Sequence, residues 1–340
     1  MRLGLNVGMF PPAMYPGAPE LTLAEIIHLA RDAEALGVEM VWMPEAPVYR
    51  EAIVPLSAMA GATRTIRLGT GILPIGYRSP LTVARTIAQL DELAEGRCLL
   101  GLGIGMRQIL EQQGIATNLP VRRLREYVTV IKRFLAGETV SFQGSFYSFE
   151  ATHLGFTAPR PEVPIFLGSY NEKSLQLAGE MAQGVILPAL CMRAWLDGAL
   201  GTLYDAAAKA GRSAADLTVT RYTITSVHAD ADVARASARH LLSYYIGSPH
   251  TDKVMKALGF FAAALKLRQA LQEKGREAAL PLVNDDIIAC FAVAGTVEQC
   301  AAQLRAFDPA KVHVHTLLPV GPSPQEAIRN VLQLCRHVLA

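Results

Sequence analysis

The chain has 340 residues, of which 51% are hydrophobic and 18% charged, whereas an average soluble domain is roughly 25% charged. This surplus of apolar residues excludes a disordered chain, which combines low hydrophobicity with high net charge. The 32 basic and 30 acidic residues leave a net charge of +2 and form no basic stripe, so nothing indicates binding to nucleic acid.

The positive mean hydropathy of +0.25 raises the question of a membrane span. The longest apolar runs, such as Ile287–Ala294, are much shorter than the roughly 20 residues that cross a bilayer, so no membrane partner is predicted. The N-terminal residues lack the pattern of a signal peptide. The five cysteines are odd in number and show no CxxC spacing, which favours a reduced cytoplasm over disulfides or a zinc site.

Strand-like and helix-like segments alternate from one end of the chain to the other. Strands are predicted, in chain order, at Leu3–Met9, Glu39–Met43, Ile66–Leu73, Cys98–Ile104, Pro164–Gly168, Gly184–Leu187, Leu217–Val227 and Val312–Leu318. Helices are predicted at Leu23–Leu36, Glu51–Thr63, Leu81–Ala94, Val121–Ala136, Glu172–Ala182, Ala194–Ala210, Asp232–Ile246 and Pro324–Val338. The segments Thr139–Phe142 and Phe146–Phe149 flank a Gly-containing turn and are predicted to form a surface hairpin.

Alternating strands and helices imply parallel strands joined by right-handed crossovers, and eight such units close into a (β/α)₈ TIM barrel. A doubly wound sheet is the alternative, although it more often has five or six strands. No linker-like or low-complexity segment divides the chain. We therefore expect residues 1–340 to be one barrel domain, with a helical insertion at about 247–294 that is placed to act as a lid.

In this fold the active site lies at the carboxyl ends of the strands. The predicted strand ends carry no lysine, which disfavours Schiff-base chemistry, and Glu45 is the one carboxylate there. Metal-assisted barrels need several carboxylates or histidines at this rim, so no metal is predicted. Glycine and apolar residues dominate instead, and this rim suits a planar organic cofactor that brings its own chemistry.

The segment Gly168-Ser169-Tyr170-Asn171 runs from a predicted strand directly into a helix. Asn171 or Ser169 is expected to cap that helix, whose first N–H groups would suit a cofactor phosphate; an ordinary helix cap is the alternative. The glycines of Gly101–Gly105 resemble part of a Rossmann fingerprint, but Met106 stands where its last glycine is needed. We interpret them as glycines that let a barrel strand bend.

Histidines and aromatic residues give weaker indications. His313 and His315 lie two apart on the last predicted strand and are interpreted as barrel-interior histidines rather than as a metal pair. His153 is a loop residue without an identifiable partner. Four aromatic residues near the insertion are compatible either with a substrate pocket or with helix packing: Tyr244, Tyr245, Phe260 and Phe261.

Taken together, the motifs resemble those of the luciferase-like monooxygenase superfamily, and within it the branch that uses the deazaflavin coenzyme F-420. The similarity extends over nearly the whole chain. The matching pieces are Val41–Ala46, Ile66–Ile72, Arg78–Pro80, Leu90–Leu93 with Gly96-Arg97, Gly101–Gly105, Val163–Gly168, Leu177–Glu180 and Ala294–Thr296. Their order and spacing together are more specific than any one piece.

The resemblance implies that a flavin-like ring is held at the barrel mouth. It implies a non-proline cis peptide between Gly71 and Ile72 that forms a bulge, together with Leu73, behind the ring. Gly103, Ile104 and Gly105 would lie beside the ring, and Gly168–Asn171 would hold the phosphate. Met9 and Phe10, at the end of the first strand, are expected to face the substrate. The family also implies a homodimer.

The sequence departs from the deazaflavin-dependent sugar-phosphate dehydrogenases of this superfamily, which carry Asp-His where this chain has Glu45-Ala46 and an acid at Met106. The pattern is more similar to the methylene-tetrahydromethanopterin reductase-like branch, in which no strong base is needed. Glu45 is retained as a candidate catalytic proton donor, with a structural role as the alternative.

The sequence leads to three alternative hypotheses about the function. The first is an oxidoreductase that transfers hydride between coenzyme F-420 and an apolar organic small-molecule substrate. The second is an FMN-dependent monooxygenase of the same superfamily, because both classes use the same glycine-rich supports. The third is a ligand-binding barrel without catalysis.

Overall fold

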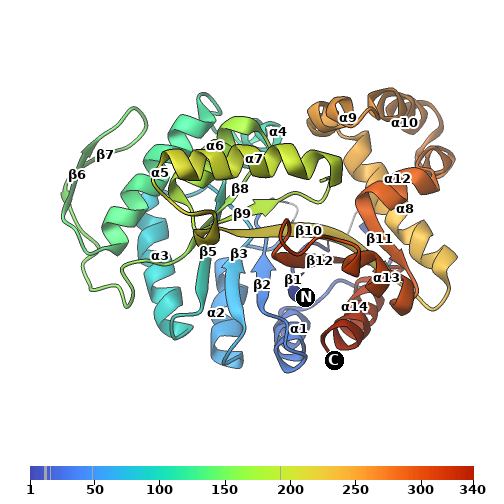
Figure 1. Cartoon of the computed structure of the whole chain (residues 1–340). Helices are drawn as coiled ribbons and strands as arrows, with labels where there is room; N and C mark the ends of the chain where they lie inside the picture. The colour runs from blue at the N-terminus through green and yellow to red at the C-terminus, as the bar shows by residue number, and fades with distance from the viewer. Residues whose placement is uncertain (11–13, 16, 48, 192) are drawn as a thin grey trace.

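A computed structural model describes residues 1–10, 14–15, 17–47, 49–191 and 193–340. Eight parallel strands form a closed barrel that is surrounded by helices (Figure 1). They are β1 (Arg2–Asn6), β2 (Met40–Met43), β3 (Arg67–Thr70), β5 (Cys98–Gly103), β8 (Ile165–Gly168), β9 (Gly184–Leu187), β10 (Thr218–Val227) and β12 (Val314–Val320). The predicted TIM barrel is confirmed. The doubly wound alternative is wrong, because a doubly wound sheet is open, whereas here β1 pairs with β12 and closes the sheet.

Two pairings close the barrel. β1 pairs with β12, with Leu3 opposite His315, and β9 pairs with β10, with Gly184 opposite Thr218. Every barrel strand is almost wholly buried, because helices cover the outside and side chains fill the inside. This explains why the strands appear in the sequence as short continuous apolar runs rather than as alternating patterns.

A further parallel strand, β11 (Ala292–Gly295), joins the sheet outside the closed barrel. It pairs with β10 at Ile224–Val227, beyond the point where β9 leaves the same edge of β10. The predicted helical insertion extends to residue 294, and this is wrong for its last residues, which form strand β11. The continuous run Ile287–Ala294 contains the end of a helix and the start of a strand, and an apolar run carries no periodicity that separates the two.

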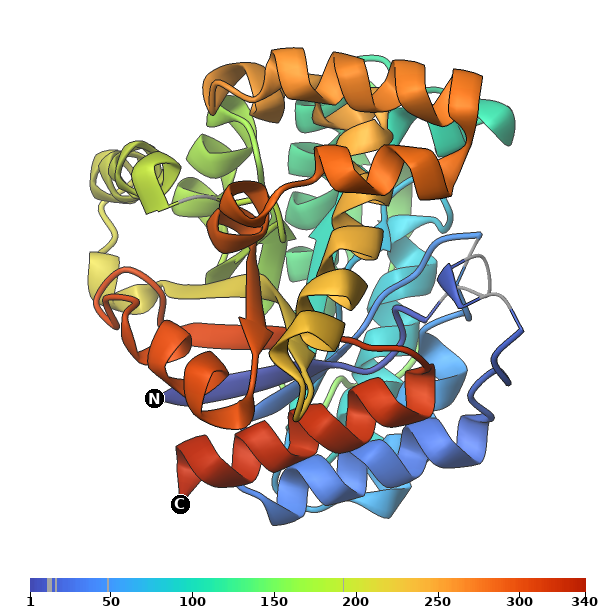
Figure 2. The ribbon, with the colours of Figure 1, turned by 90° about the vertical axis from the view of Figure 1, so that its right-hand side faces the viewer.

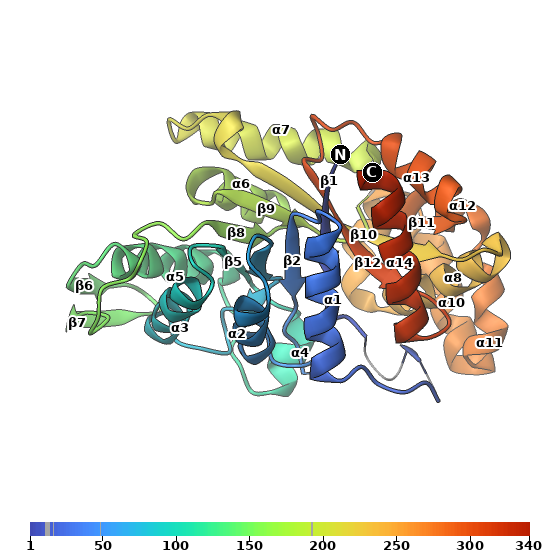
Figure 3. The ribbon, with the colours of Figure 1, turned by 90° about the horizontal axis from the view of Figure 1, so that it is seen from below.

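Outer helices follow the strands in order and form a ring around the barrel (Figure 3). They are α1 (Leu23–Ala35), α2 (Ile53–Ala62), α3 (Pro80–Leu93), α5 (Pro120–Leu135), α6 (Glu172–Met181), α7 (Arg193–Lys209), α8 (Ala231–Gly247), α13 (Val297–Arg305) and α14 (Pro324–Leu339). Many begin at a side-chain cap. Thr22 and Glu25 form a capping box at α1, and Ser79 caps α3, whose first residue is Pro80.

Two hydrophobic layers hold this arrangement together. One layer fills the space between the strands and the outer helices, as with Leu3, Val41 and Ile87. The other lies inside the barrel, where Trp42 and Phe166 meet edge to face with ring centroids 5.3 Å apart. The inner layer is dominated by bulky side chains, so the barrel is a packed core that opens only at its mouth.

The region predicted as a helical insertion contains short helices before β11. They are η3 (Pro249–Thr251), α9 (Asp252–Ala257), α10 (Phe261–Lys274), α11 (Arg276–Ala279), η4 (Leu280–Leu282) and α12 (Asp285–Phe291). These helices pack on α8 and form a layer of their own at one side of the barrel (Figure 2). No helix in the described part of the chain is both long and apolar enough to cross a membrane.

Smaller elements complete the chain. The predicted surface hairpin is present as β6 (Val140–Gln143) and β7 (Ser148–Thr152). Three short pieces were not predicted: β4 (Leu73–Pro74), α4 (Arg107–Gln112) and η2 (Ala214–Asp216). The five cysteines are free thiols in this structure.

Candidate active site at the barrel mouth

A bulge at the end of β3 forms the centre of the candidate site. The strand predicted over Ile66–Leu73 ends at Thr70, continues through a cis peptide between Gly71 and Ile72, and resumes as β4. The expected cis peptide is thus present. The Gly71 N–H donates to the carbonyl of Met43 over 2.8 Å, which ties the bulge to the end of β2.

The Ile72 side chain brings the three predicted cofactor-binding segments together. A Cβ atom added to Gly103 would lie 2.8 Å from Ile72, and one added to Gly168 would lie 3.1 Å from it. Neither position has room for a side chain while Ile72 stays in place. Glycine at the ends of β5 and β8 therefore lets the Ile72 side chain pack against both strands.

The segment after β5 supports the bulge from the other side. Pro74 pairs with Gly103, and the N–H of Ile75 donates to the Gly103 carbonyl over 3.0 Å. Gly105 has φ of +81°, a conformation that L-residues rarely adopt. A Cβ added to Gly101 would lie only 1.8 Å from the Thr70 carbonyl oxygen. Close approach of two barrel strands thus explains the glycine pattern, and the Rossmann interpretation is wrong.

The phenol of Tyr222 also holds the bulge, and sequence analysis missed it. Tyr222 lies on β10, across the barrel from β3, and its hydroxyl donates to the Gly71 carbonyl over 2.6 Å. Its side chain is buried, and burial raises the pKa of this phenol, so it stays protonated and donates. The sequence did contain a signal for the direction of the Tyr222 side chain. In the predicted strand Leu217–Val227, Tyr222 lies on the same face as Thr220 and Ile224.

The segment predicted to bind a phosphate begins with a well-formed helix cap. The Asn171 side chain accepts from the N–H of Ser174 over 3.1 Å, and Ser174 Oγ accepts from the N–H groups of Tyr170 and Asn171. Ser169 does not cap the helix by the usual bond, since its hydroxyl donates to the Ser174 carbonyl. Its N–H donates to the carbonyl of Ile186.

These bonds decide which donors an anion can reach. The N–H groups of residues 169–171 are already engaged, whereas the first N–H groups of a helix have no partner within it. At α6 these belong to Glu172 and Lys173. A cofactor phosphate at this end of β8 would therefore be held mainly by these two N–H groups.

Glu45, the candidate proton donor, is part of an ion-pair network. Its buried carboxylate pairs with the Arg78 guanidinium and accepts a bond from the N–H of Ala52 over 3.3 Å. Arg78 also pairs with Glu51 at 2.7 Å. A carboxylate engaged in this way links the end of β2 to Arg78 and to the start of α2, and this geometry favours the structural alternative for Glu45.

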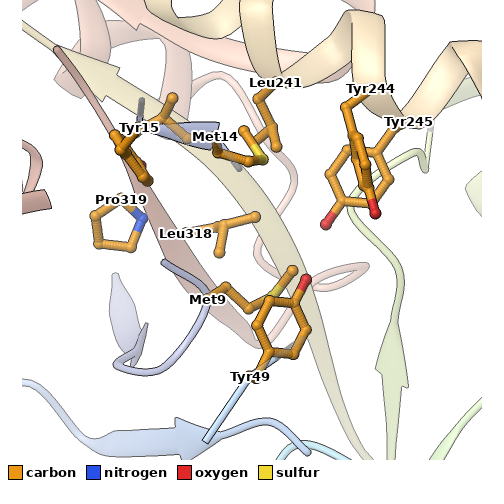
Figure 4. A pocket seen from close by; sticks show the side chains of 10 residues that line it. Met9, Met14, Tyr15, Tyr49, Leu241, Tyr244, Tyr245, Leu318 and Pro319 are labelled. Carbon is orange, nitrogen blue, oxygen red and sulfur yellow. The ribbon is translucent and has the colours of Figure 1, made fainter. Parts of the chain in front are cut away.

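The other half of the mouth is apolar and rich in tyrosine (Figure 4). Asn6 at the end of β1 accepts bonds from the N–H groups of Gly8 and Met9, which fixes the turn that carries Met9 and Phe10. A small cavity there has ten lining residues: Met9, Met14, Tyr15, Tyr49, Leu241, Tyr244, Tyr245, Leu318, Pro319 and Val320. Met9 faces this cavity, whereas Phe10 packs against Tyr15 at a centroid distance of 6.3 Å.

For the four aromatic residues near the insertion, the sequence left open a role in a pocket or in helix packing, and the structure assigns two of them to each. Tyr244 and Tyr245 lie on α8 and line the cavity, as the pocket interpretation requires. Phe260 packs on Phe291 of α12 at 5.8 Å, and Phe261 lies under the Lys256 ammonium at 4.4 Å. The two phenylalanines therefore serve the packing of the insertion.

The histidines lie away from the mouth. His313 precedes β12 and accepts from the N–H of Val219 over 3.0 Å. His315 is buried beside Thr223 and meets the Phe307 ring at 4.9 Å. Since Val314 and Thr316 take the interior positions of β12, the expectation that these histidines face the barrel interior is wrong. His153 is exposed after β7, and the described residues contain no cluster suited to a metal ion.

Comparison with known proteins agrees with this geometry. The family profile described as luciferase-like monooxygenase matches residues 1–335. The chain belongs to the luciferase-like monooxygenase family. It is 30% identical to a 5,10-methylenetetrahydromethanopterin reductase of Methanolobus tindarius, over 92% of this chain and 96% of the relative. A reductase of the same name from Archaeoglobus fulgidus is also 30% identical, over 92% of this chain and 95% of the relative.

A solved structure within the family matches nearly the whole chain. The coenzyme F-420-dependent tetrahydromethanopterin reductase from Methanopyrus kandleri superposes with a TM-score of 0.83 at 25% identity, covering 98% of this chain and 97% of the other. The family and the branch expected from the sequence motifs are thereby confirmed.

Proposed function

We propose that this member of the luciferase-like family is an oxidoreductase that transfers hydride between deazaflavin coenzyme F-420 and an apolar organic substrate. The observation that carries the proposal is the composition of the mouth. Its glycines at the ends of β5 and β8 make room for Ile72, its rim carboxylate Glu45 is ion-paired, and the cavity on the other side is lined by apolar and tyrosine side chains. Such a site provides support and shape and relies on a bound cofactor for redox chemistry.

The residues present fit a flat ring with an anionic tail. Gly103 and Gly168 leave space that the Ile72 side chain fills, and Ile72 would serve as an apolar support for a flat ring. The N–H groups of Glu172 and Lys173 begin a ten-residue helix and suit a phosphate. When bound, a deazaflavin accepts or donates hydride. The matching structure supports this cofactor over FMN, because that tetrahydromethanopterin reductase is coenzyme F-420-dependent.

In this proposal the chain's own groups bind, orient and exclude water. Tyr222 holds the Gly71 carbonyl, and the Met43 carbonyl holds the Gly71 N–H, so the bulge is fixed from two sides. The pair of Glu45 and Arg78 links the segment after β2 to the segment after β4. Met9, Leu241 and Leu318 keep the substrate side apolar. Orientation of this kind is a large part of what a protein adds to a cofactor reaction.

The test is a titration of the purified protein with oxidised coenzyme F-420 and, in parallel, with FMN. Changes in cofactor fluorescence report binding. The proposal predicts saturable binding of the deazaflavin and markedly weaker binding of FMN. Saturation by FMN alone would move the assignment to the monooxygenase class, and saturation by neither cofactor would favour a ligand-binding barrel.

A further inference from the structure

The cavity in Figure 4 contains phenols that have no partner in the protein. Tyr49 follows β2, and Tyr244 and Tyr245 lie on α8; in Figure 4 their hydroxyl ends point toward one another. Among the described residues, none of these three hydroxyls makes a hydrogen bond. Tyr49 and Tyr245 are half-buried and line the cavity. Because their hydroxyls bind nothing in the described chain, they are free to donate to an acceptor that enters the cavity.

The chemistry of the lining restricts that group. None of the ten lining residues is charged. Burial raises the pKa of the Tyr49 and Tyr245 phenols, with neighbouring tyrosines adding to the effect, so both remain protonated donors. A carboxylate or phosphate placed here would lose its water without gaining a cation, which is costly. A neutral oxygen acceptor gains donors and keeps its body among methionine and leucine side chains.

Size and position restrict it further. The enclosed space is about 10 Å³, enough for one water-sized group. It therefore receives the oxygen end of a ligand and not a whole ring. The Tyr222 phenol that binds the Gly71 carbonyl belongs to the same hydrophobic cluster as Leu241 and Leu318 of the cavity, and Tyr245 packs against that cluster. The cavity thus adjoins the bulge on which the proposed cofactor would lie.

From this placement we infer that Tyr49 and Tyr245 form a tyrosine recess that binds the carbonyl oxygen of an uncharged ketone or aldehyde substrate. The inference rests on the proposed function, because the bound carbonyl compound is a substrate only if the protein transfers hydride. It names the chemical class of that substrate. A phenol that donates to a carbonyl oxygen draws electron density from the carbon that would receive hydride. Tyr244, which is 44% exposed, lies at the entrance of the recess.

The test compares three probes on the protein saturated with oxidised coenzyme F-420 and on the cofactor-free protein. Acetophenone has an apolar body and a carbonyl, ethylbenzene has a similar body without oxygen, and benzoate carries a charge. Calorimetry or saturation-transfer NMR measures each affinity. We expect acetophenone to bind most tightly and benzoate least. A Tyr49→Phe or Tyr245→Phe variant should weaken acetophenone binding about three- to tenfold, the size of one hydrogen bond.

Two controls make the result decisive. Tyr204→Phe removes a phenol on α7, outside the recess, and should leave acetophenone affinity unchanged. Ethylbenzene affinity should not change in the Tyr49 or Tyr245 variants. Equal affinity of the wild-type protein for acetophenone and ethylbenzene, or preference for benzoate, overturns the recess even if coenzyme F-420 binds. Failure of coenzyme F-420 to bind, with the acetophenone preference intact, overturns the proposed function and leaves the recess standing.

Discussion

At the scale of single residues, the account depends on groups that a small substitution can test. Gly168 lies at the end of β8, between Ile72 and the start of α6. Gly168→Asp places a carboxylate near the proposed phosphate. We expect cofactor affinity to fall about tenfold or more, because like charges about 4 Å apart repel by roughly 4 kcal/mol near a protein surface. Fluorescence titration with coenzyme F-420 measures the change.

Gly168→Asn is the matched control for that substitution. It has nearly the same shape as aspartate and the same Cβ contact with Ile72, but it carries no charge. Cofactor affinity should be clearly higher in the asparagine variant than in the aspartate variant. If both variants bind equally, the phosphate lies elsewhere and the helix-terminus argument fails.

Tyr222→Phe removes the hydroxyl that donates to the Gly71 carbonyl and leaves the ring in place. We expect the free energy of unfolding to fall by about 1 kcal/mol, since the buried carbonyl loses its partner. Cofactor affinity should fall as well, because the bulge is less firmly held. Urea unfolding and cofactor titration measure the two effects, and unchanged affinity would show that Tyr222 has only a structural role.

At the residue scale the sequence could locate features with a local signal, whereas the cofactor role of these residues stays a prediction. The glycines at 71, 103 and 168 are visible at the ends of strand-like runs, and the structure gathers them around Ile72. Tyr222 and Gly71 are 151 positions apart, and Glu45 and Arg78 are 33 apart. No local pattern connects such partners, so only the fold shows that Tyr222 binds the bulge and that the one rim acid is ion-paired.

At the scale of elements, a carboxylate on α1 is bound to the start of β3. Glu34 accepts from the N–H groups of Arg64, Thr65 and Ile66. Burial raises the pKa of Glu34, but these N–H donors outweigh it and hold the pKa at about 2. Its ordinary value is about 4.3. A depressed folded-state pKa contributes stability above the unfolded value, and this contribution is lost as the pH falls toward 2.

Glu34→Gln should therefore be less stable than the wild-type protein at pH 7, and the difference should shrink between about pH 5 and pH 2. Urea unfolding at pH 7 and at pH 3 measures this, provided both proteins remain folded before urea is added. A difference that stays constant over this range would mean that the charge of Glu34 plays no part in holding α1 to β3.

Close packing between β3 and β5 gives a second element-scale prediction. Gly101→Ala brings a methyl group against the Thr70 carbonyl, and backbone atoms on both sides cannot easily move. We expect a loss of about 1–3 kcal/mol in unfolding free energy, typical of overpacking. Gly61→Ala is the control, because nothing lies within 4 Å of the added Cβ on α2. That variant should be as stable as the wild type or slightly more stable.

Element bounds could be predicted well because most helices end at a glycine or begin at a capping residue. Strand β11 was missed because Ile287–Ala294 is uniformly apolar, and such a run does not show where helix α12 ends. The split of the predicted strand at Gly71 was implied by family resemblance rather than by periodicity. Local pattern thus locates elements, whereas irregularities that matter for the site depend on contacts between strands.

At the scale of the whole molecule, the low charge count found in the sequence has a structural location. Apolar side chains fill the space outside the strands, the interior of the barrel and the tyrosine half of the mouth. The glycine half, from β3, β5 and β8, offers backbone and shape. Tyr222 connects the two halves, since it binds the Gly71 carbonyl and belongs to the interior cluster that includes Leu241 and Leu318. The two proposals would therefore place cofactor support and substrate recognition side by side.

The central claim is that a bound deazaflavin, and not a set of acidic or metal-binding side chains, carries the chemistry. The most direct measurement is to express the chain in a host that makes both coenzyme F-420 and FMN, and to identify the cofactor that copurifies by its absorption spectrum and mass. The account predicts the deazaflavin, at close to one molecule per barrel. Recovery of FMN in its place, or of protein without either cofactor, would contradict it.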